Sequence, residues 1–295
     1  MRLPQGWLEE SVYVAMDGRN VSRIRAPDGR RFIRKPVPAD SAERWIYENV
    51  LSGLPVHYPR LLESPVAGGE AVESLWFEDL GALTHNYDLS LALRVVRYVA
   101  YWHNYATEPG RLASLCGLKP TYDQMANEVL AMQRLLTGMA DKHGIDRSRL
   151  ARFYREIEET RLTDAPVLSH GDLHVGNYAC VNGQTYVLDW EHAHLNVRYW
   201  DLFHLIDLTH PLYPRSVSPE WRETLLRAYY DESERLGLPV DRITFELEYR
   251  LFAGVFSLWM LGLIEQDLLN PDCVWPKSRL QTQASETADI IGQII

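Results

Sequence analysis

One stretch of the chain, VLSHGDLHVGNYACVNGQTYVLDWE (residues 167–191), joins a polar loop to two short runs of strand-forming residues. Asp172 follows a His-Gly pair, and Asn177 lies five residues after it. The two runs are separated by Asn182-Gly183, and Asn-Gly between such runs is the strongest short signal for a β-hairpin. Asp189 follows the second run directly. Because a hairpin brings its outer ends together, we expect Asn177 and Asp189 to lie close to each other.

These three side chains are of the types that phosphoryl transfer from a nucleoside triphosphate requires. The reaction needs a carboxylate that orients the acceptor hydroxyl and takes its proton, and hard oxygen ligands that hold Mg²⁺ against the phosphates. Asp172 suits the first task, and the side-chain oxygens of Asn177 and Asp189 suit the second. The sequence therefore predicts a catalytic loop at residues 170–177 and a metal site shared by its end and the end of the hairpin.

The loop HGDLHVGN (170–177) followed by VLDWE (187–191) resembles the aminoglycoside phosphotransferase and choline kinase superfamily. That superfamily has a catalytic loop related to that of protein kinases, with Gly171 at the position where protein kinases have arginine. The resemblance implies an α+β, protein-kinase-like bilobal fold. Its N-terminal lobe is a small antiparallel β-sheet with one helix, and its larger C-terminal lobe is mostly helical. It also implies that Asp201, in WDLFHLI, is a structural aspartate that anchors the catalytic loop through its backbone.

The N-terminal part of the chain provides a candidate for nucleotide binding. Residues 21–25 and 31–35 alternate as strands around Asp28-Gly29, which predicts a hairpin. Kinases of this type have a lysine at the end of the second strand for the α- and β-phosphates. Lys35 and Arg34 compete for this role, and they would point to opposite faces because side chains alternate along a strand. The pattern Phe-Ile-x-Lys favours Lys35.

The phosphate-binding lysine usually pairs with a glutamate on the following helix. Ser41 is a suitable N-cap, and the pattern predicts a helix over residues 42–51. Glu43 and Glu48 are both candidates for the partner. The register of the resembling family favours Glu43, which leaves Glu48 as a surface charge.

The turn that should cover the phosphates differs from that of protein kinases. Residues 16–20, MDGRN, contain one glycine, and the chain has no G-x-G-x-x-G motif. The phosphotransferase branch commonly lacks this motif. Arg19 and Asn20 could each donate to a phosphate, and the sequence does not select between them.

A strand predicted at residues 71–77 runs into Glu-Asp-Leu-Gly, which resembles the family's hinge between the lobes. Backbone groups of Glu78 and Leu80 would then hold the adenine, with Trp76 or Phe77 packed nearby. We accordingly expect a nucleotide-binding lobe at residues 1–81 and a catalytic and substrate-binding lobe at residues 82–295. The remaining apolar periodicity predicts helices at residues 89–105, 122–140, 148–160, 220–236, 244–268 and 278–294, and another beginning at residue 200.

Composition and charge exclude several classes of protein. At 295 residues the chain is long enough for two lobes, and its 40 acidic against 30 basic residues argue against nucleic acid as a partner. The longest apolar stretch, residues 251–264, is too short to span a bilayer and predicts a buried helix. Three widely spaced cysteines and the lack of a secretory leader indicate a cytoplasmic protein without disulfides. The oligomeric state is left open.

Histidine and tryptophan are abundant around the predicted site. His192 and His194 have no cysteine or carboxylate partners spaced for a tetrahedral zinc site, and His170 is better explained as a residue that fixes the catalytic loop by hydrogen bonds. An aromatic cage for a quaternary ammonium group is an alternative to plain core packing. The tryptophans considered for it are Trp102, Trp190, Trp200, Trp221, Trp259 and Trp275.

The resemblance and the residues together predict a small-molecule kinase. It would use ATP, with GTP as the alternative nucleotide, and Mg²⁺, and it would phosphorylate a hydroxyl of a small-molecule substrate. An aminoglycoside or other antibiotic kinase, a choline or ethanolamine kinase and a sugar kinase are the alternatives among enzymes. The alternative outside enzymes is a nucleotide-binding pseudokinase with a structural role, like the spore-coat relatives of the family.

Overall fold

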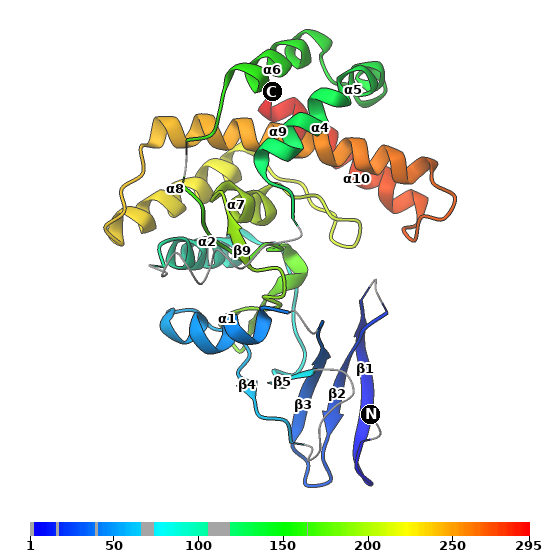
Figure 1. The fold of residues 1–295 in the computed structure, drawn as a ribbon, viewed down its shortest axis with the longest axis vertical. Coiled ribbons are helices and arrows are strands. Elements are labelled where there is room, and N and C mark those ends of the chain that lie inside the picture. Colours follow the sequence, from blue (N-terminus) through cyan, green and yellow to red (C-terminus); the bar gives the residue numbers. More distant parts are fainter. Residues whose placement is uncertain (1–2, 16–17, 39–40, 66–73, 106–118, 164) are drawn as a thin grey trace.

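The computed structural model describes residues 3–15, 18–38, 41–65, 74–105, 119–163 and 165–295. The chain forms a smaller lobe built on an antiparallel sheet and a larger lobe built mainly of helices (Figure 1). The N-terminal end lies beside the outermost strand of the sheet, and the C-terminal end lies among the helices of the larger lobe. The predicted α+β class and its two-lobed arrangement are confirmed.

The sheet of the smaller lobe has the strand order β1-β2-β3-β5-β4. Its strands are β1 (Leu8–Val14), β2 (Asn20–Arg25), β3 (Arg31–Pro36), β4 (Leu61–Leu62) and β5 (Ser74–Glu78). The predicted hairpin of β2 and β3 is confirmed, with Gly29 in its turn at φ +86°. Residues 71–73 of the strand predicted before the hinge lie outside the described residues, and the part that is described is β5.

The helix of the smaller lobe is shorter than predicted. Helix α1 (Glu43–Asn49) begins with Ala42 at the cap position, and a 3-10 turn at Leu51–Gly53 follows it. Ser41 still contributes at this end, because its Oγ accepts a hydrogen bond from the Glu43 N–H at 3.2 Å. Val50 is the C-cap, with its N–H bonded to the Ile46 carbonyl, so the α-helix ends before the predicted residue 51.

The predicted helices of the larger lobe are present, most of them to within two residues. They are α2 (Leu89–His103), α4 (Tyr122–Ala131), α5 (Gln133–Met139), α6 (Arg147–Glu159), α7 (Tyr199–Ile206), α8 (Pro219–Arg235), α9 (Arg242–Leu269) and α10 (Lys277–Ile294). The single helix predicted at 122–140 is wrong, because the backbone leaves helical geometry at Met132. The Met132 side chain lies over Gly262 of α9, where a Cβ atom would come within 3.0 Å of it.

Helix α9 is the central helix of this lobe and is longer than its apolar stretch suggested. Its 28 residues are long and apolar enough to cross a membrane by length and composition, which corrects the expectation drawn from residues 251–264. However, 72% of its most apolar window is buried inside the protein. It lies alongside α10 (Figure 1), and the predicted buried helix is therefore confirmed.

Two small sheets complete the fold and hold the catalytic segment. Strands β7 (Tyr178–Val181) and β8 (Gln184–Val187) form the predicted hairpin, with Asn182 at φ +49° and Gly183 at φ +80° in its turn. Strand β6 (Val167–Ser169) pairs with β9 (His194–Asn196). The sequence did not predict β9, because three residues are too few to show an alternating pattern.

One hydrophobic core extends across both lobes. Ile46 of α1 and Phe77 of β5 belong to the same buried cluster as the helices of the larger lobe. A separate small cluster inside the sheet contains Ile24, Phe32 and Trp76. The lobe boundary that we propose lies between residues 81 and 82, after β5 and before α2.

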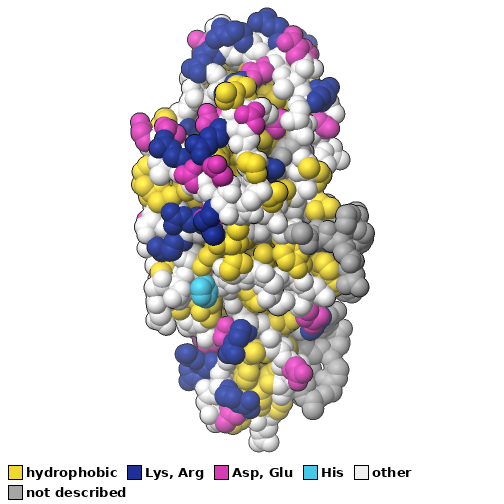
Figure 2. Space-filling view, turned by 90° about the vertical axis from the view of Figure 1, so that its left-hand side faces the viewer, with side chains coloured by type: hydrophobic (Ala, Val, Ile, Leu, Met, Phe, Trp, Pro, Cys, Tyr) yellow, Lys and Arg dark blue, Asp and Glu magenta, His cyan; other side chains and the backbone are white. Residues whose placement is uncertain are grey.

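Charged side chains on the surface are mixed in sign. On the face shown in Figure 2, basic and acidic side chains of the described residues lie near one another over both lobes.

Candidate active site

The catalytic loop is held in place by a buried carboxylate on helix α7. Asp201 accepts hydrogen bonds from the backbone N–H groups of His170 at 2.8 Å and Gly171 at 3.1 Å, and from the Ser169 hydroxyl at 2.7 Å. Burial raises the pKa of Asp201, but hydrogen bonds and charge, that of His103 first, outweigh it and hold the pKa well below its ordinary value. The predicted anchoring of the loop by Asp201 is confirmed.

Gly171 is required by the close approach of another chain segment. Its φ of +84° lies in the left-handed region, and a Cβ atom there would lie 2.0 Å from the carbonyl oxygen of His192. The segment before β9 therefore packs directly against the backbone of the loop. This contact explains why glycine stands here and a larger residue cannot.

His170 connects the loop to the end of strand β8. The side chain is fully buried, its Nε2 lies 2.8 Å from the carbonyl oxygen of Leu188, and its Nδ1 accepts from the Asp172 N–H at 3.3 Å. Burial lowers the pKa of His170, so the ring is neutral and Nε2 is the protonated nitrogen. The predicted role of His170 in fixing the loop is confirmed.

Asp172 and Asn177 face each other within this loop. The Nδ2 of Asn177 donates to the carbonyl oxygen of Asp172 at 2.7 Å and to its Oδ2 at 3.3 Å. These bonds use the amide nitrogen of Asn177, and its amide oxygen takes no part in them. Burial raises the pKa of Asp172, but His174 and the charge of Lys119 outweigh it and hold the pKa well below its usual range.

Lys35 lies at the centre of a second cluster, formed between the lobes. Its Nζ is 2.7 Å from Glu43 Oε2, 2.7 Å from Asp189 Oδ1 and 3.1 Å from Glu191 Oε2. The structure thus brings Lys35 and Glu43 together. Glu48 instead lies on the surface and pairs with Arg44 at 3.6 Å.

Arg34, the competing cation on β3, points elsewhere. Its Nη2 lies 2.7 Å from Glu9 Oε1, on strand β1. Adjacent residues of a strand face opposite sides, so the choice between Arg34 and Lys35 follows from the register of β3.

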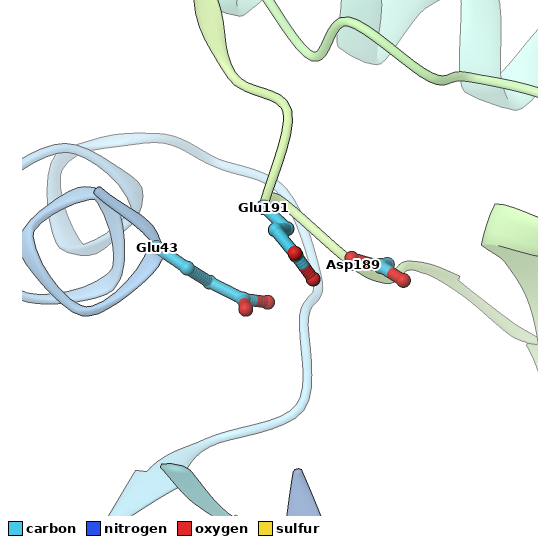
Figure 3. A group of neighbouring side chains, drawn as sticks. All are labelled: Glu43, Asp189 and Glu191. Atoms are coloured by element: carbon cyan, nitrogen blue, oxygen red, sulfur yellow. The ribbon is translucent and has the colours of Figure 1, made fainter. Parts of the chain in front are cut away.

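The three carboxylates around Lys35 converge on one point (Figure 3). The ligand atoms of Glu43, Asp189 and Glu191 lie within 4.8 Å of one another, which is close enough to hold a cation. The Lys35 ammonium already provides that cation. Burial would lower the pKa of Lys35, but the charges of the three carboxylates, Glu43 first, raise it well above its ordinary value. Burial raises the pKa of Glu43 to about 7, against the opposing charge of Lys35.

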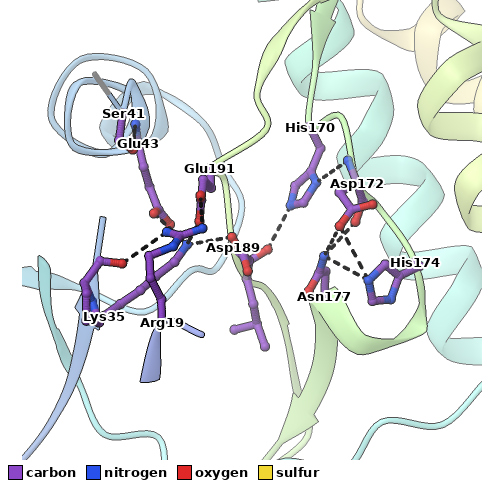
Figure 4. Close-up of polar contacts among 12 residues, drawn as sticks. Arg19, Lys35, Ser41, Glu43, His170, Asp172, His174, Asn177, Asp189 and Glu191 are labelled. Carbon is purple, nitrogen blue, oxygen red and sulfur yellow. Dashed lines mark hydrogen bonds and ion pairs between the residues drawn. The ribbon is translucent and has the colours of Figure 1, made fainter. Parts of the chain in front are cut away.

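Asp189 links this cluster to the catalytic loop. Its φ of +59° turns the chain sharply out of β8, and the Leu188 N–H donates to the carbonyl oxygen of Asn177 at 2.8 Å. Figure 4 shows Asp189 between Lys35 on one side and the pair Asp172 and Asn177 on the other. The hairpin thus brings together its two ends, as its Asn-Gly turn predicted.

The family model described as the phosphotransferase enzyme family matches residues 63–238. The chain belongs to the phosphotransferase enzyme family. No curated protein sequence matches the chain. The matched residues include β5, the catalytic loop and the β7–β8 hairpin, and they exclude Lys35 and α1. The assignment of the family is therefore independent of Lys35 and Glu43, whereas Asp189 and Glu191 lie within the matched residues.

Solved structures of family-like kinases share the fold over nearly the whole chain. An amicoumacin kinase is 13% identical, with a TM-score of 0.59, covering 97% of this chain and 88% of that one. A macrolide 2′-phosphotransferase from Brachybacterium faecium is 18% identical, with a TM-score of 0.55 and coverages of 97% and 93%. A choline kinase from Cryptosporidium parvum Iowa II is 11% identical, with a TM-score of 0.57 and coverages of 97% and 90%. At these identities the likeness establishes the kinase-like fold of this phosphotransferase.

The segment predicted as the hinge follows β5. Glu78 binds Arg60 three times: its N–H donates to the Arg60 carbonyl at 3.0 Å, and its carboxylate accepts from the Arg60 backbone and side chain at 2.9 Å each. The carbonyl group of Glu78 and the N–H of Leu80 are therefore the hinge groups that we propose for an adenine. Phe77 is buried in the main core and Trp76 in the sheet's own cluster.

An aromatic wall stands next to Asp172 on the side away from Lys35. His174 stacks against His210 at 4.7 Å and against Tyr213 at 5.8 Å between ring centroids, and Trp275 lies 6.2 Å from His210. A cavity of about 300 Å³ beside His210 is lined by His210, Pro211, Pro214 and residues of helix α10. Of the tryptophans considered for a cage, Trp275 is the one in this wall. The buried ones, which pack in the core instead, are Trp102, Trp190 and Trp200.

The remaining histidines near the site hold the structure together. His194 Nδ1 bonds to the carbonyl oxygen of His192 at 2.7 Å, and its Nε2 lies 3.0 Å from the Asn196 amide. Both ring nitrogens of His194 are thus within hydrogen-bond distance of a partner. Among the described residues, the one group of side chains placed to hold a metal ion contains no histidine.

Sequence reasoning missed two charged residues of the site. Glu191 contacts Lys35, and Lys119 Nζ lies 3.7 Å from Asp172 Oδ1. Lys119 belongs to a loop without a motif, so no signal pointed to it. Glu191 is the last residue of the VLDWE run, two positions after Asp189, and that spacing could have indicated it.

Proposed function

We propose that this phosphotransferase is a small-molecule kinase that transfers the γ-phosphoryl group of ATP to a substrate hydroxyl. The proposal rests chiefly on one observation: Lys35, paired with Glu43, and Asp172, paired with Asn177, face each other across Asp189. A lysine for the phosphates, a carboxylate for the acceptor and oxygen ligands for a metal are the parts that phosphoryl transfer needs. Asp172, Asn177, Asp189, Lys35 and Glu43 keep their predicted roles in this proposal.

The residues present fit Mg²⁺. The Asn177 amide oxygen and the Asp189 carboxylate are hard ligands, and the Asp189 side chain is 41% exposed toward the space between the lobes. Mg²⁺ bound there would neutralise the charge that develops on the phosphates.

The chain's own residues would carry the transfer as follows. Lys35 holds the α- and β-phosphates, and Glu43 keeps its ammonium in place. Asp172, ionised at neutral pH because of its low pKa, orients the acceptor hydroxyl and takes its proton. The acceptor oxygen forms a bond to the γ-phosphorus while the bond from that phosphorus to the β–γ bridging oxygen breaks. The products are the phosphorylated acceptor and ADP.

The acceptor would enter from the aromatic wall. The cavity beside His210 is within the range of pockets that hold small molecules, and His174 links it to Asp172 through a 3.6 Å contact. An amicoumacin kinase solved with AMP-PNP and Ca²⁺, and a spectinomycin phosphotransferase solved with ADP, share the fold and support a nucleotide and a divalent cation here. Antibiotics, choline, ethanolamine and sugars are therefore the acceptor classes to test.

Thermal unfolding tests the nucleotide part of the proposal. Mg-ATP should raise the unfolding temperature, because a ligand that binds only the folded state stabilises it by mass action. Lys35→Ala should reduce this shift, and Arg34→Ala, whose side chain bonds to Glu9 on the other face of β3, should leave it unchanged. The absence of a shift with ATP and with GTP, each with Mg²⁺ and with Mn²⁺, would contradict the kinase proposal.

Turnover tests the acceptor part. ADP release measured against a panel of hydroxylated antibiotics and metabolites should rise with at least one acceptor class. A protein that binds Mg-ATP and phosphorylates none of them would favour the pseudokinase alternative.

A further inference from the structure

We propose that Arg19 is a phosphate-binding residue of this site, and that its side chain takes the place of the glycine-rich loop that the sequence lacks. The inference rests on the proposed function, because it names a further residue for the same nucleotide. It selects Arg19 over Asn20, whose amide lies between the hydroxyls of Ser11 and Ser22 within the sheet.

The turn between β1 and β2 delivers Arg19 to the space between the lobes. The Ala15 N–H donates to the Arg19 carbonyl at 2.8 Å, and Gly18 has φ +84°, so the chain reverses immediately before Arg19. The guanidinium then reaches past the end of β3, where Nη1 donates to the carbonyl oxygen of Pro36 at 3.2 Å. Pro36 is the residue after Lys35, so Arg19 approaches the same end of the strand as the proposed phosphate-binding lysine.

One carboxylate holds Arg19 and Lys35 side by side. Glu191 Oε1 accepts from Arg19 Nη2 at 2.6 Å, and Glu191 Oε2 lies 3.1 Å from Lys35 Nζ (Figure 4). The two oxygens of a carboxylate are only about 2 Å apart, so the two cations are close neighbours that would repel each other without it.

A pair of adjacent cations at the mouth of a nucleotide site is suited to an oligophosphate. Guanidinium groups bind phosphate through several N–H donors in a planar fork, whereas an ammonium acts as a point charge. The Arg19 side chain is 26% exposed and therefore accessible to a ligand that enters between the lobes. In protein kinases the corresponding turn covers the phosphates with backbone from a glycine-rich loop. Here the arginine of a turn with one glycine would provide the cover.

The test compares ligands that differ only in their phosphates. The Kd values of adenosine, ADP and ATP, the nucleotides with Mg²⁺, would be measured by calorimetry for the wild type and for Arg19→Gln, Arg19→Lys and Arg34→Gln. Arg19→Gln should weaken ATP binding about 10-fold or more, the size of one charge-assisted hydrogen bond to phosphate. It should leave the Kd of adenosine unchanged. Arg19→Lys should recover part of the loss, because it keeps the charge without the fork.

Arg34→Gln is the matched control. Like Arg19, Arg34 is a partly buried arginine paired with a carboxylate, but its partner is Glu9 of strand β1. Arg34→Gln should change none of the three Kd values. Equal losses for adenosine and ATP in Arg19→Gln would mean that the residue supports the fold, and no loss for either would mean that it is a surface ion pair. Each of these results would overturn the inference. If the wild-type protein bound no nucleotide, both the inference about Arg19 and the proposed function would be wrong.

A double-mutant cycle distinguishes two roles for Arg19: direct contact with the phosphates, and an ion pair with Glu191 that joins the two lobes. If Arg19 acts on the nucleotide only by holding Glu191, Arg19→Gln should have no further effect in a Glu191→Gln background. Direct contact predicts that Arg19→Gln still weakens ATP relative to adenosine in that background. A loss of ATP binding that disappears when Glu191 is replaced would refute the assignment.

Discussion

At the scale of single residues, the site depends on positions that accept only one type of residue. Gly171 is one, because the carbonyl oxygen of His192 occupies the place of a Cβ atom. Asp172 is another, because the backbone and side chain of the same loop aim its carboxylate at the space between the lobes. The physical reasons differ. Gly171 is required because there is no space for a side chain, and Asp172 is required because its charge must point in one direction.

Gly171→Ala should destabilise the protein by about 2–5 kcal/mol, from left-handed backbone strain together with overpacking. Gly183→Ala is the matched control, since Gly183 also has positive φ but has open space where the Cβ would lie. It should lose only about 1–2 kcal/mol. Urea unfolding of both variants measures the difference in the free energy of unfolding. Equal losses would show that the close approach of His192 does not contribute to the cost of the substitution.

Asp172→Asn should lower the turnover number by about 10²–10⁴-fold, the usual contribution of a general base. The variant keeps size and hydrogen bonding, so the unfolding temperature and the Kd of Mg-ATP should change little. Steady-state kinetics with an identified acceptor gives the result. Turnover at the wild-type rate would remove Asp172 from the mechanism.

At the scale of elements, helix α7 positions the catalytic loop through its first turn and anchors itself through its last. Asp201 near its start binds the loop, whereas Asp207 at its end binds Arg222 at 2.7–3.0 Å and the Tyr249 hydroxyl at 2.6 Å. Both carboxylates are fully buried. The two aspartates at opposite ends of this short helix therefore have separate roles: Asp201 holds the loop, and Asp207 holds the helix to the rest of the lobe.

Asp201→Asn should destabilise the protein by about 3–5 kcal/mol, because donors that face a buried carboxylate would lose their acceptor. In the wild type the folded-state pKa of Asp201 lies below its unfolded value, so its contribution is present above about pH 4 and is lost as the pH falls through the folded-state pKa. The difference between variant and wild type should therefore shrink below about pH 4.

Asp207→Asn should cost similar stability and provide the control for activity. The folded fraction of Asp207→Asn should turn over at the wild-type rate, while that of Asp201→Asn should be slower because its loop has lost its anchor. Equal turnover in the two folded variants would contradict the assigned role of Asp201.

At the scale of the whole molecule, the two lobes share a core. Ile46 of α1 and Phe77 of β5 are buried in the same cluster as helices of the larger lobe, and the ion pairs of Lys35 and Arg19 cross the same boundary. Among the residues that the structure describes, the small cluster of the smaller lobe contains four buried residues, among them Ile24 and Trp76. The smaller lobe therefore lacks a core large enough to fold by itself.

We expect the chain to unfold in one cooperative transition, with equal calorimetric and van't Hoff enthalpies. A fragment of residues 1–81 should be unfolded by circular dichroism. Two separate transitions, or a folded fragment, would show that the lobes are independent.

The sequence by itself determined the elements that depend on neighbouring residues. The choice of Lys35 and of Glu43 came from the resemblance to the family's strand and helix, whereas the β7–β8 hairpin followed from turn chemistry over a few neighbouring residues. Most helices of the larger lobe likewise followed from apolar periodicity over neighbouring residues. The family followed from the loop and hairpin together.

Only the tertiary structure decided which distant residues meet. The pairing of β6 with β9, the contact of Lys119 with Asp172, and the bridge from Arg19 through Glu191 to Lys35 join segments far apart in the chain. None of these contacts has a local pattern, because a short strand shows no periodicity and a single charged residue is as often solvated as paired. Burial and electrostatics acting across the closed fold select these partners, and they also decide that Arg19, and not Asn20, faces the proposed nucleotide site.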